Sequence, residues 1–496
     1  MKKRKLLRLA ILLFFCFFAF LYLKEGQKGR GPTEQGKVLD DSIFLQNLWE
    51  KYQGEEKEDR GKTIEKNKTV RIVLQNQVGG YYHKKITFTA NSAFIVSHRG
   101  KQLSYKAGEK VTMYAKDVKT DKKPYTIQVK GSGRIKICTL KKQSIHPSYR
   151  GQMKIYAEKA GLVLVNTLSM EQYLYAVVPS EISSGCKMEA MKAQAVCART
   201  YAYNQIKGSR YEKYHADLDD SVACQVYNNV PENRRSRKAV DDTDSMVLTQ
   251  KGKRIQVYYF STSWGATASG KSVWNTENDI SYLPARYQKV QTAAKEESAP
   301  NLASEKAFMS FIRKPPFQSY DTDSPWFRWN MVIATEALER KIEAALNACH
   351  QSNPYLILYE TKGGGFKKMS YRDIGEIIDI RISKREKSGL VTELIIRGKE
   401  NSVKVLTQYN IRCVLGSSGA AVNNKNGEIF LDLLPSAAFY IQKGKKDVFY
   451  LYGGGFGHGA GMSQFGAMTM AEDGFDFSEI LMHYFEGVSI TRVEDK

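Results

Sequence analysis

Three things are scarce or missing in this sequence. No internal repeat is visible along its 496 residues, and no two of its seven cysteines are closely spaced. Acidic residues are few beside basic ones, with 52 Asp and Glu against 75 Lys and Arg, which gives a formal net charge of +23. Without a tight cysteine pattern, nothing indicates a small disulfide-stapled domain, and the redox state of the cysteines stays open.

The length and composition are those of a folded, multidomain protein. A chain of 496 residues predicts two to four domains with linkers. Its 42% hydrophobic residues, 29 tyrosines and 22 phenylalanines argue against long disordered tracts.

The N-terminus predicts a membrane anchor. A basic opening, Met1 to Arg8, is followed by an almost purely apolar run from Leu9 to Leu23. Counted from Leu6, this run is near the lower limit of what spans a bilayer. It ends without a small-residue cleavage pattern, so we expect an uncleaved anchor with its basic end in the cytoplasm and the rest of the chain outside the membrane.

The predicted anchor also bears on the meaning of the basic charge. A charge of +23 on a cytoplasmic protein would suggest nucleic acid as a partner, but an exported chain is not expected to bind it. Outside the membrane, a basic surface suits anionic lipids and wall polymers. Alternatively, dispersed lysines only solubilise the domain.

Hydrophobic periodicity predicts an α+β fold, in which a helical catalytic core is combined with β-rich domains behind one N-terminal transmembrane helix. Strand-like alternation begins at residue 69, and glycine, proline and charged stretches suggest the boundaries. The expected parts are a cytoplasmic tail with anchor (1–24), a stalk (25–68), a β-rich domain (69–148), the catalytic core (149–290), an inserted α+β region (291–450) and a C-terminal piece completing the catalytic domain (451–496).

Two helices are predicted around Glu181. Ser169 and Gln172 have capping-box spacing, and we expect Pro179 to close the first helix just before Glu181. The second helix is predicted from about residue 187 to residue 206, with small and apolar residues at spacings of three and four.

Further along, residues 277–323 are mixed and charged, and we interpret them as an insertion or linker. Thr335 is predicted to cap the next helix, and Asp476 with Glu479 form a second capping box that opens the last helix.

Glu181 is a candidate acid/base. Its neighbours Val177, Val178, Pro179 and Ile182 are apolar, and an apolar setting raises the pKa of a carboxyl group. Such a group holds a proton near neutral pH and can donate it to a leaving oxygen. The alternative is a solvated loop glutamate or a helix cap.

The most unusual segment is the glycine-rich loop from Gly453 to Gly461. It lacks the Lys-Ser/Thr ending of a phosphate-binding loop, so we exclude nucleotide binding. Its glycines would let the backbone approach a bulky polymer, with His458 and Gln464 offering hydrogen bonds. The alternative is a tight structural turn.

His215, Asp219 and Cys224 lie within ten residues. An imidazole, a carboxylate and a thiolate could hold a structural zinc ion, although this is not a standard finger spacing. A Cys-His pair equally suggests a thiol hydrolase.

Five segments, in this order, resemble the SpoIID/LytB family of peptidoglycan lytic transglycosylases and amidase enhancers. The segments are Tyr173-Leu-Tyr-Ala-Val-Val-Pro-Ser-Glu181, Glu189-Ala-Met-Lys-Ala-Gln-Ala-Val-Cys-Ala-Arg-Thr-Tyr201, Cys224-Gln-Val-Tyr227, Tyr259-Phe-Ser-Thr-Ser263 and Gly455-Phe-Gly-His-Gly-Ala-Gly-Met-Ser-Gln-Phe-Gly466.

The resemblance implies an enzyme that cleaves the MurNAc-GlcNAc bond of peptidoglycan and leaves 1,6-anhydro ends, with a cell-wall amidase as partner and no required cofactor. It implies Glu181 as the catalytic residue. The residues it implies along the glycan groove are Lys192, Arg199, His458, Ser463 and Gln464.

Two positions depart from the family pattern. Asp219 stands where relatives often carry a cysteine, which weakens the zinc site seen in some members. Trp264 replaces the usual first glycine after the Ser-Thr-Ser segment. Two other hypotheses stay open: a non-catalytic, glycan-binding enhancer of an amidase, and a scaffold that only holds wall material.

Overall fold

The computed structural model describes residues 69–493 except 143–144, 207, 291–300 and 446. The anchor and stalk predicted for residues 1–24 and 25–68 lie outside the described residues. Among the helices of the described part, none has both the length and the apolar character needed to cross a bilayer.

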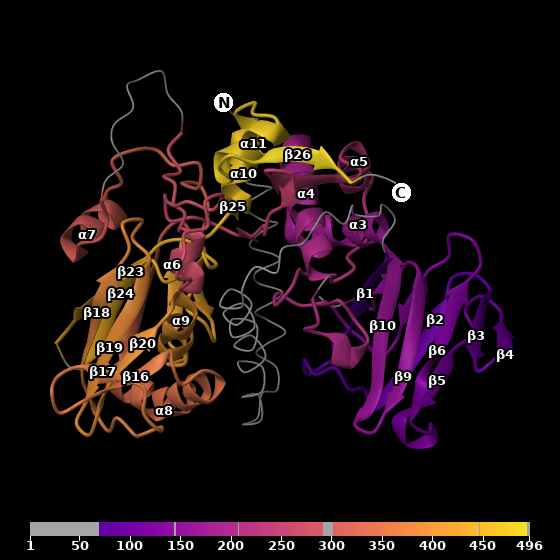
Figure 1. The fold of residues 1–496 in the computed structure, drawn as a ribbon, viewed down its shortest axis with the longest axis horizontal. Helices are drawn as coiled ribbons and strands as arrows, with labels where there is room; N and C mark the ends of the chain where they lie inside the picture. Colours follow the sequence, from indigo (N-terminus) through magenta and orange to yellow (C-terminus); the bar gives the residue numbers. More distant parts are fainter. Residues whose placement is uncertain (1–68, 143–144, 207, 291–300, 446, 494–496) are drawn as a thin grey trace. The chain divides into compact units, whose positions relative to one another are not determined.

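The chain folds into two compact units, which are described separately. Among the described residues, the N-terminal unit comprises 69–257 together with 489–493, and the C-terminal unit comprises Tyr258–Val488. Both contain helices and strands, as the predicted α+β class requires (Figure 1).

The N-terminal unit is built on a seven-stranded sheet of order β11-β1-β10-β9-β6-β3-β4. Its pairs are antiparallel except for β1 with β11, which is parallel. The strands are β1 (Thr69–Val73), β3 (Phe94–His98), β4 (Lys101–Tyr105), β6 (Asp121–Val129), β9 (Gln152–Glu158), β10 (Gly161–Ser169) and β11 (Leu218–Asp219).

Two smaller sheets and three α-helices complete this unit. One sheet has the order β5-β2-β7-β8, and the other has the order β13-β12-β26. The elements are β2 (Lys85–Ala90), β5 (Val111–Tyr114), β7 (Ile135–Ile137), β8 (Ser148–Tyr149), β12 (Met246–Gln250), β13 (Lys253–Arg254), β26 (Ser489–Arg492), α3 (Met170–Glu181), α4 (Met188–Gln205), α5 (Arg234–Asp242) and the 3-10 turns η1 (Ala115–Asp117) and η2 (Glu212–Tyr214).

Burial along the strands follows the sequence pattern. In β9 every second side chain is buried, as expected for a sheet with one face in the core. By contrast β10, a central strand, is buried from its first residue through Leu168. This continuous apolar run is typical of a strand that is covered on both faces.

The C-terminal unit contains two five-stranded antiparallel sheets, of order β22-β21-β15-β24-β23 and β17-β16-β20-β19-β18. The first consists of β15 (Trp329–Ala334), β21 (Ala421–Asn424), β22 (Gly427–Phe430), β23 (Phe439–Lys443) and β24 (Val448–Gly453). The second consists of β16 (Ile357–Glu360), β17 (Phe366–Lys367), β18 (Ile377–Arg385), β19 (Val391–Gly398) and β20 (Ser402–Leu406).

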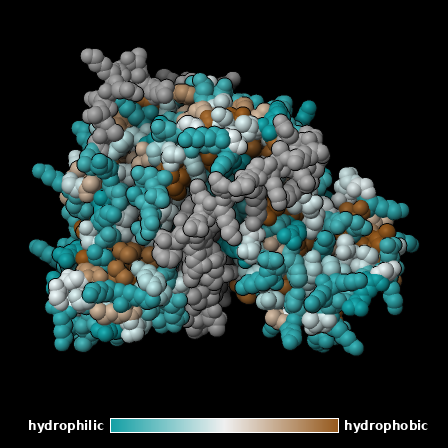
Figure 2. All heavy atoms as spheres, viewed as in Figure 1, coloured by the Kyte–Doolittle hydropathy of each residue, from teal (hydrophilic) through white to brown (hydrophobic). Residues whose placement is uncertain are grey.

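Side chains of these sheets and of two helices form one large core. The helices of the unit are α6 (Gly270–Trp274), α7 (Glu305–Arg313), α8 (Thr335–Ser352), α9 (Gln408–Gly416), α10 (Gln464–Glu472) and α11 (Phe477–Tyr484). A two-stranded parallel pair joins β14 (Tyr259–Phe260) to β25 (Met462–Ser463). On the face drawn in Figure 2, hydrophilic residues dominate and apolar ones form small groups.

The structure corrects three local predictions. Pro179 does not end the first helix, because α3 continues through it to Glu181. Thr335 is the first residue of α8 and not its cap, and its hydroxyl donates to the Asp447 carbonyl at 2.8 Å. The supposed linker at 277–323 contains α7 and fully buried polar side chains such as Asp321.

Other local predictions are confirmed. The Ser169 hydroxyl accepts the Gln172 N–H at the start of α3, and Asp476 with Glu479 form a complete capping box at the start of α11. All six cysteines of the described part are free thiols. Two of them, Cys349 and Cys413, are hydrogen-bonded neighbours in the core of the C-terminal unit.

Candidate functional site

Glu181 is the last residue of α3, where this helix gives way to the loop before α4. A proline inside a helix lacks the N–H for its own intrahelical bond. The Pro179 ring nevertheless fits near the end of α3, and the following Ile182 N–H still reaches the Val178 carbonyl at 3.0 Å. The helix thereby carries Glu181 on an ordered turn.

The carboxylate of Glu181 is held by a second family segment. Its Oε1 accepts the Val226 N–H at 2.7 Å, so residues 224–227 lie against the end of α3. Beside it, Gln225 Nε2 donates to the buried Tyr173 hydroxyl at 3.2 Å, and the Tyr173 and Tyr227 rings are 5.1 Å apart. The structure therefore brings two segments of the resemblance, 173–181 and 224–227, together around Glu181.

Arg199 has a structural position that the resemblance does not imply. Its side chain is 0% exposed, and its guanidinium forms a two-pronged pair with Glu171, at 2.8 Å from Nε and 2.6 Å from Nη2. It also donates to the carbonyls of Val240 and Met246. Arg199 thus ties α3, α5 and β12 to α4, and in this fold it does not reach a groove surface.

Lys192 lies on the outer side of α4. Its ammonium is 2.9 Å from Glu189 Oε1 and 3.8 Å from Asp242 Oδ2, and the side chain is 19% exposed. It can reach a ligand only by leaving these carboxylates. The structure therefore does not place Lys192 at a preformed substrate contact.

The three residues predicted to hold zinc have separate partners. His215 Nε2 lies 2.9 Å from Glu158 Oε1, and its ring stacks on Tyr156 at 3.8 Å. Asp219 accepts from the hydroxyls of Tyr81 and Ser221. Within the described residues, no group of three or more His, Cys, Asp or Glu side chains could hold a metal ion, so the structure gives the zinc hypothesis no support.

Cys224 does not have the chemistry of a thiol nucleophile. Burial, reinforced by the nearby Asp219 charge, raises the pKa of its thiol to about 12. The protonated thiol donates to the Tyr211 hydroxyl at 3.6 Å. A reactive cysteine needs a lowered pKa, which argues against the thiol-hydrolase alternative.

In the C-terminal unit, the glycine-rich loop packs closely on Trp264. This indole is 1% exposed and donates to the Ser388 carbonyl at 2.8 Å. A Cβ atom at Gly459 would lie 2.7 Å from the Trp264 ring, and Gly459 also has a φ of +88°. A Cβ atom at Gly454 or Gly455 would lie 3.0 Å or 3.2 Å from the nearest Trp264 atom. The glycines therefore make room for the protein's own tryptophan, which favours the structural-turn interpretation of this loop.

His458 is held in this loop as a neutral imidazole. Its Nδ1 accepts the Ala460 N–H at 3.1 Å, and the rings of Tyr258, Phe260 and Trp274 surround it with centroids 5.7 to 6.2 Å away. Burial, and to a smaller extent the Arg412 charge, lower the pKa of His458 to about 4, although a hydrogen bond with the Tyr259 backbone raises it.

Ser463 and Gln464 are also buried, at 0% and 5% exposure. Ser463 caps α10 by accepting the Gly466 N–H and donates its hydroxyl proton to Asp321 Oδ1 at 2.5 Å. The predicted groove residues therefore divide between the two units: Lys192 and Arg199 lie in the N-terminal unit, and His458, Ser463 and Gln464 in the C-terminal unit.

Asp321 is the residue that sequence reasoning missed. Its fully buried carboxylate accepts from the Ser263 N–H at 2.9 Å, the Ser263 hydroxyl at 2.7 Å and the Ser463 hydroxyl. It thereby joins the Ser-Thr-Ser segment to the start of α10. Burial raises the pKa of Asp321 to about 6, although these donors favour the charged form. No local pattern marks Asp321, because its partners are distant in the sequence.

Comparison with known proteins agrees with this arrangement. A family model described as Stage II sporulation protein (SpoIID) matches residues 158–250, and a domain of unknown function (DUF8618) matches residues 356–461. The first match contains Glu181 and the Val226 amide that holds it. This match covers three of the five segments, and with the relatives described next it supports the resemblance to the SpoIID/LytB family.

Curated relatives are similar at low identity. The amidase enhancer of Bacillus subtilis (strain 168) is 26% identical over 64% of this chain, and this match spans 40% of the relative's length. The stage II sporulation protein D of Bacillus amyloliquefaciens is 25% identical, and the match covers 66% of this chain and 76% of the relative. An uncharacterized protein of Brachyspira hyodysenteriae is 28% identical, and the match covers 69% of this chain and 72% of the relative.

The burial of Arg199 leads to a stability prediction. Glu171→Gln leaves a buried guanidinium without its carboxylate, so we expect the free energy of unfolding to fall by about 3 kcal/mol. Urea denaturation followed by circular dichroism measures this. Glu189→Gln makes the same change in the more exposed ion pair with Lys192, and it should lower the free energy of unfolding by less than about 1 kcal/mol. Equal losses in the two variants would contradict a structural role for Arg199.

The lowered pKa of His458 predicts acid lability. On unfolding the imidazole regains its ordinary pKa, so between pH 6.5 and about 4 the unfolded chain binds a proton that the folded chain does not. Stability therefore falls as the pH falls through this window, by up to about 3 kcal/mol for this group.

The matched variant is His458→Asn, whose Oδ1 can still accept the Ala460 N–H but which does not titrate. Its unfolding free energy, measured by urea denaturation at pH 7 and pH 5, should change less with pH than that of the wild type. Asp321 acts in the opposite direction, because its raised pKa favours the folded state as the pH falls below 6. This contribution is the same in the variant and in the wild type, so it cancels when their unfolding free energies are subtracted. An unchanged pH slope would refute the prediction.

Proposed function

We propose that this chain is a peptidoglycan lytic transglycosylase in which Glu181 is the acid/base. The observation that carries the proposal is the position of Glu181: it ends α3 and is fixed by the Val226 N–H at 2.7 Å, where two family segments meet. The family resemblance gives the substrate class, the glycan strands of the bacterial cell wall. No cofactor is required for this reaction.

In the proposed reaction, protonated Glu181 donates its proton to the oxygen between MurNAc and GlcNAc as the bond from C1 to that oxygen breaks. The resulting carboxylate then takes the proton of the sugar's own 6-hydroxyl while O6 bonds to C1. The products are a free GlcNAc end and a 1,6-anhydro-MurNAc end, and Glu181 is protonated again. Because the attacking hydroxyl is tethered to the same sugar, its effective concentration is high and no second carboxylate is needed to activate water.

The proposal places the protein in the cell membrane as a single-pass protein, with residues 6–23 as anchor and the two units outside. A cell-wall amidase is the proposed partner, because one curated relative is an amidase enhancer. Removal of stem peptides by an amidase would expose the glycan strand to Glu181.

A second candidate function is a non-catalytic enhancer that binds glycan and stimulates the amidase. The observation that favours it is the burial of Arg199, Ser463 and Gln464, which serve the fold rather than a substrate. In this case Glu181 would be one more structural hydrogen-bond acceptor, for the Val226 amide.

The test is Glu181→Gln, which keeps an acceptor for the Val226 N–H but cannot exchange the proton. We expect loss of 1,6-anhydro-muramyl products from amidase-treated peptidoglycan, measured by mass spectrometry, with binding to sacculi retained. A loss of at least about 100-fold is the expected effect of removing a general acid. The control is Glu189→Gln, which should digest as the wild type does.

An amidase assay on the same two variants separates the candidates. Full stimulation of an amidase by Glu181→Gln, with no anhydro product from the wild type, would establish the enhancer and reject the transglycosylase. If the wild-type protein neither releases fragments nor stimulates an amidase, only a scaffold role remains.

A further inference from the structure

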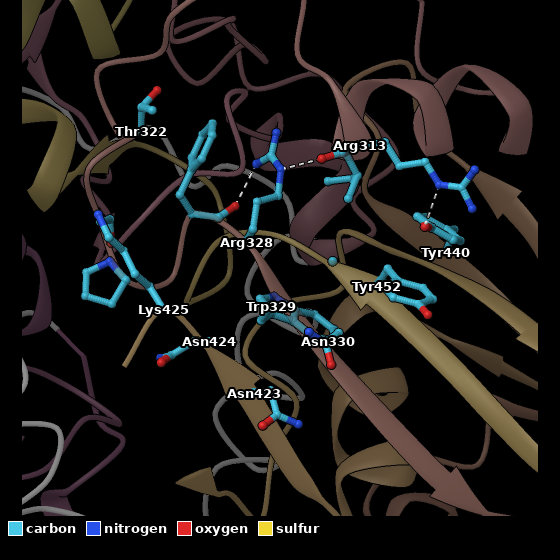
Figure 3. A pocket seen from close by; sticks show the side chains of 15 residues that line it. Arg313, Thr322, Arg328, Trp329, Asn330, Asn423, Asn424, Lys425, Tyr440 and Tyr452 are labelled. Carbon is cyan, nitrogen blue, oxygen red and sulfur yellow. Dashed lines mark hydrogen bonds between the residues drawn. The ribbon is translucent and has the colours of Figure 1, made fainter. Parts of the chain in front are cut away.

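A pocket of about 420 Å³ opens in the C-terminal unit, apart from the segments of the family resemblance that contain Glu181 and the glycine loop's His458. It lies at the ends of β15, β21, β23 and β24 and beside the end of α7 (Figure 3). Its volume is within the range of small-molecule sites. All fifteen lining residues belong to this one unit.

A row of polar and aromatic side chains crosses the sheet in this pocket. The strand register places Asn423 opposite Asn330, Asn330 opposite Tyr452, and Tyr452 opposite Tyr440. Side chains of paired residues lie on the same face of a sheet. The Tyr440 and Tyr452 rings stack at 5.1 Å, so two amides and two phenol rings form one continuous surface.

Two hydrogen-bond donors at the pocket are buried without a partner among the described residues. They are the indole N–H of Trp329, whose side chain is 3% exposed, and Nδ2 of Asn424. The other amide atom of Asn424, Oδ1, already accepts the Asn426 N–H at 2.8 Å, which fixes Nδ2 as the free donor. A buried donor without a partner costs about 1–3 kcal/mol. Because successive side chains alternate between the two faces of a sheet, Trp329 and Asn424 lie on the face opposite to Asn330 and Asn423 and do not belong to the row.

The charge at the pocket is positive. Arg313, Arg328 and Lys425 line it, and none of the fifteen lining residues is an Asp or Glu. Arg328 is held by main-chain carbonyls, among them that of Ile312 at 2.7 Å, while Arg313 donates to the Tyr440 hydroxyl at 3.2 Å (Figure 3). Cations without a carboxylate beside them favour an anionic ligand, and guanidinium groups match carboxylates in geometry.

We infer that this pocket is an auxiliary glycan-binding site that takes a carboxylate-bearing saccharide. The ring of Tyr452, which is backed by the buried Tyr440, supports a sugar ring, and Asn330 and Asn423 bond its hydroxyls. Lys425 and Arg313 neutralise the carboxylate. The choice of ligand rests on the proposed function, since peptidoglycan strands carry a carboxylate on each muramic acid once the stem peptide has been removed.

The experiment measures binding separately from cleavage. The full chain carrying Glu181→Gln is titrated into fluorescently labelled, amidase-treated glycan oligosaccharides, and anisotropy gives Kd. Asn330→Ala with Asn423→Ala, and separately Lys425→Glu, should each raise Kd by about tenfold, which corresponds to about 1.4 kcal/mol. Asn330 and Lys425 are exposed, so these changes leave the fold intact.

The matched control is Lys367→Glu, an equally exposed lysine on β17 outside the pocket, which should leave Kd unchanged. Oligosaccharides with their carboxyl groups reduced to alcohols should bind about tenfold more weakly, as expected if a charge-assisted hydrogen bond is lost.

Three results would overturn the inference: wild-type affinity in the Asn330/Asn423 double variant, equal binding of the reduced oligosaccharide, or tighter binding of a poly(glycerol phosphate) chain than of glycan. Each is independent of the Glu181 assay. If Glu181→Gln in an otherwise wild-type chain still releases anhydro products, the proposed acid/base role fails while the binding result stands.

Discussion

The C-terminal unit depends on one buried carboxylate. Asp321 accepts hydrogen bonds from Ser263 and Ser463, which are 200 residues apart in the sequence, and these bonds lie next to the parallel pairing of β14 with β25. A buried charge is stable only when it is well hydrogen-bonded, so the serines of both family segments are fixed by this requirement. The glycine loop between β24 and β25 then has to fold against Trp264, and a Cβ atom at Gly454, Gly455 or Gly459 would come within 3.2 Å of that side chain. The most unusual part of the sequence is thus explained by packing and hydrogen bonding within one unit.

Much of the fold was predictable from local pattern. The strands beginning near residues 70, 86, 94, 153 and 161, the α4 helix, the Ser169 cap and the Asp476–Glu479 capping box follow from alternation, helical spacing and cap residues, which act over a few positions. The predictions that were wrong required knowledge of distant contacts. Pro179 lies close enough to the end of α3 to be tolerated, and the charged appearance of residues 277–323 concealed Asp321, whose partners lie elsewhere in the chain.

The candidate site was predictable only in part. Glu181 stays a prediction from the family segments, and the structure shows that the Val226 amide holds its side chain in a fixed position. The same segments also contain Arg199, Ser463 and Gln464, and the structure buries all three. A family segment therefore does not distinguish residues that stabilise the fold from residues that contact a ligand. The pocket at β15 and β24 carries no sequence signal, since its asparagines and tyrosines come together only through strand register.

The last strand of the described chain, β26, pairs antiparallel with β12, so the N-terminal unit receives its final edge from Ser489–Arg492. The whole C-terminal unit is therefore an excursion between two neighbouring strands of another sheet. During synthesis the ribosome must finish that excursion before the earlier unit can complete its β-structure. Domains generally fold in the order in which they leave the ribosome. This topology reverses that order, because the N-terminal unit emerges first but completes its fold last.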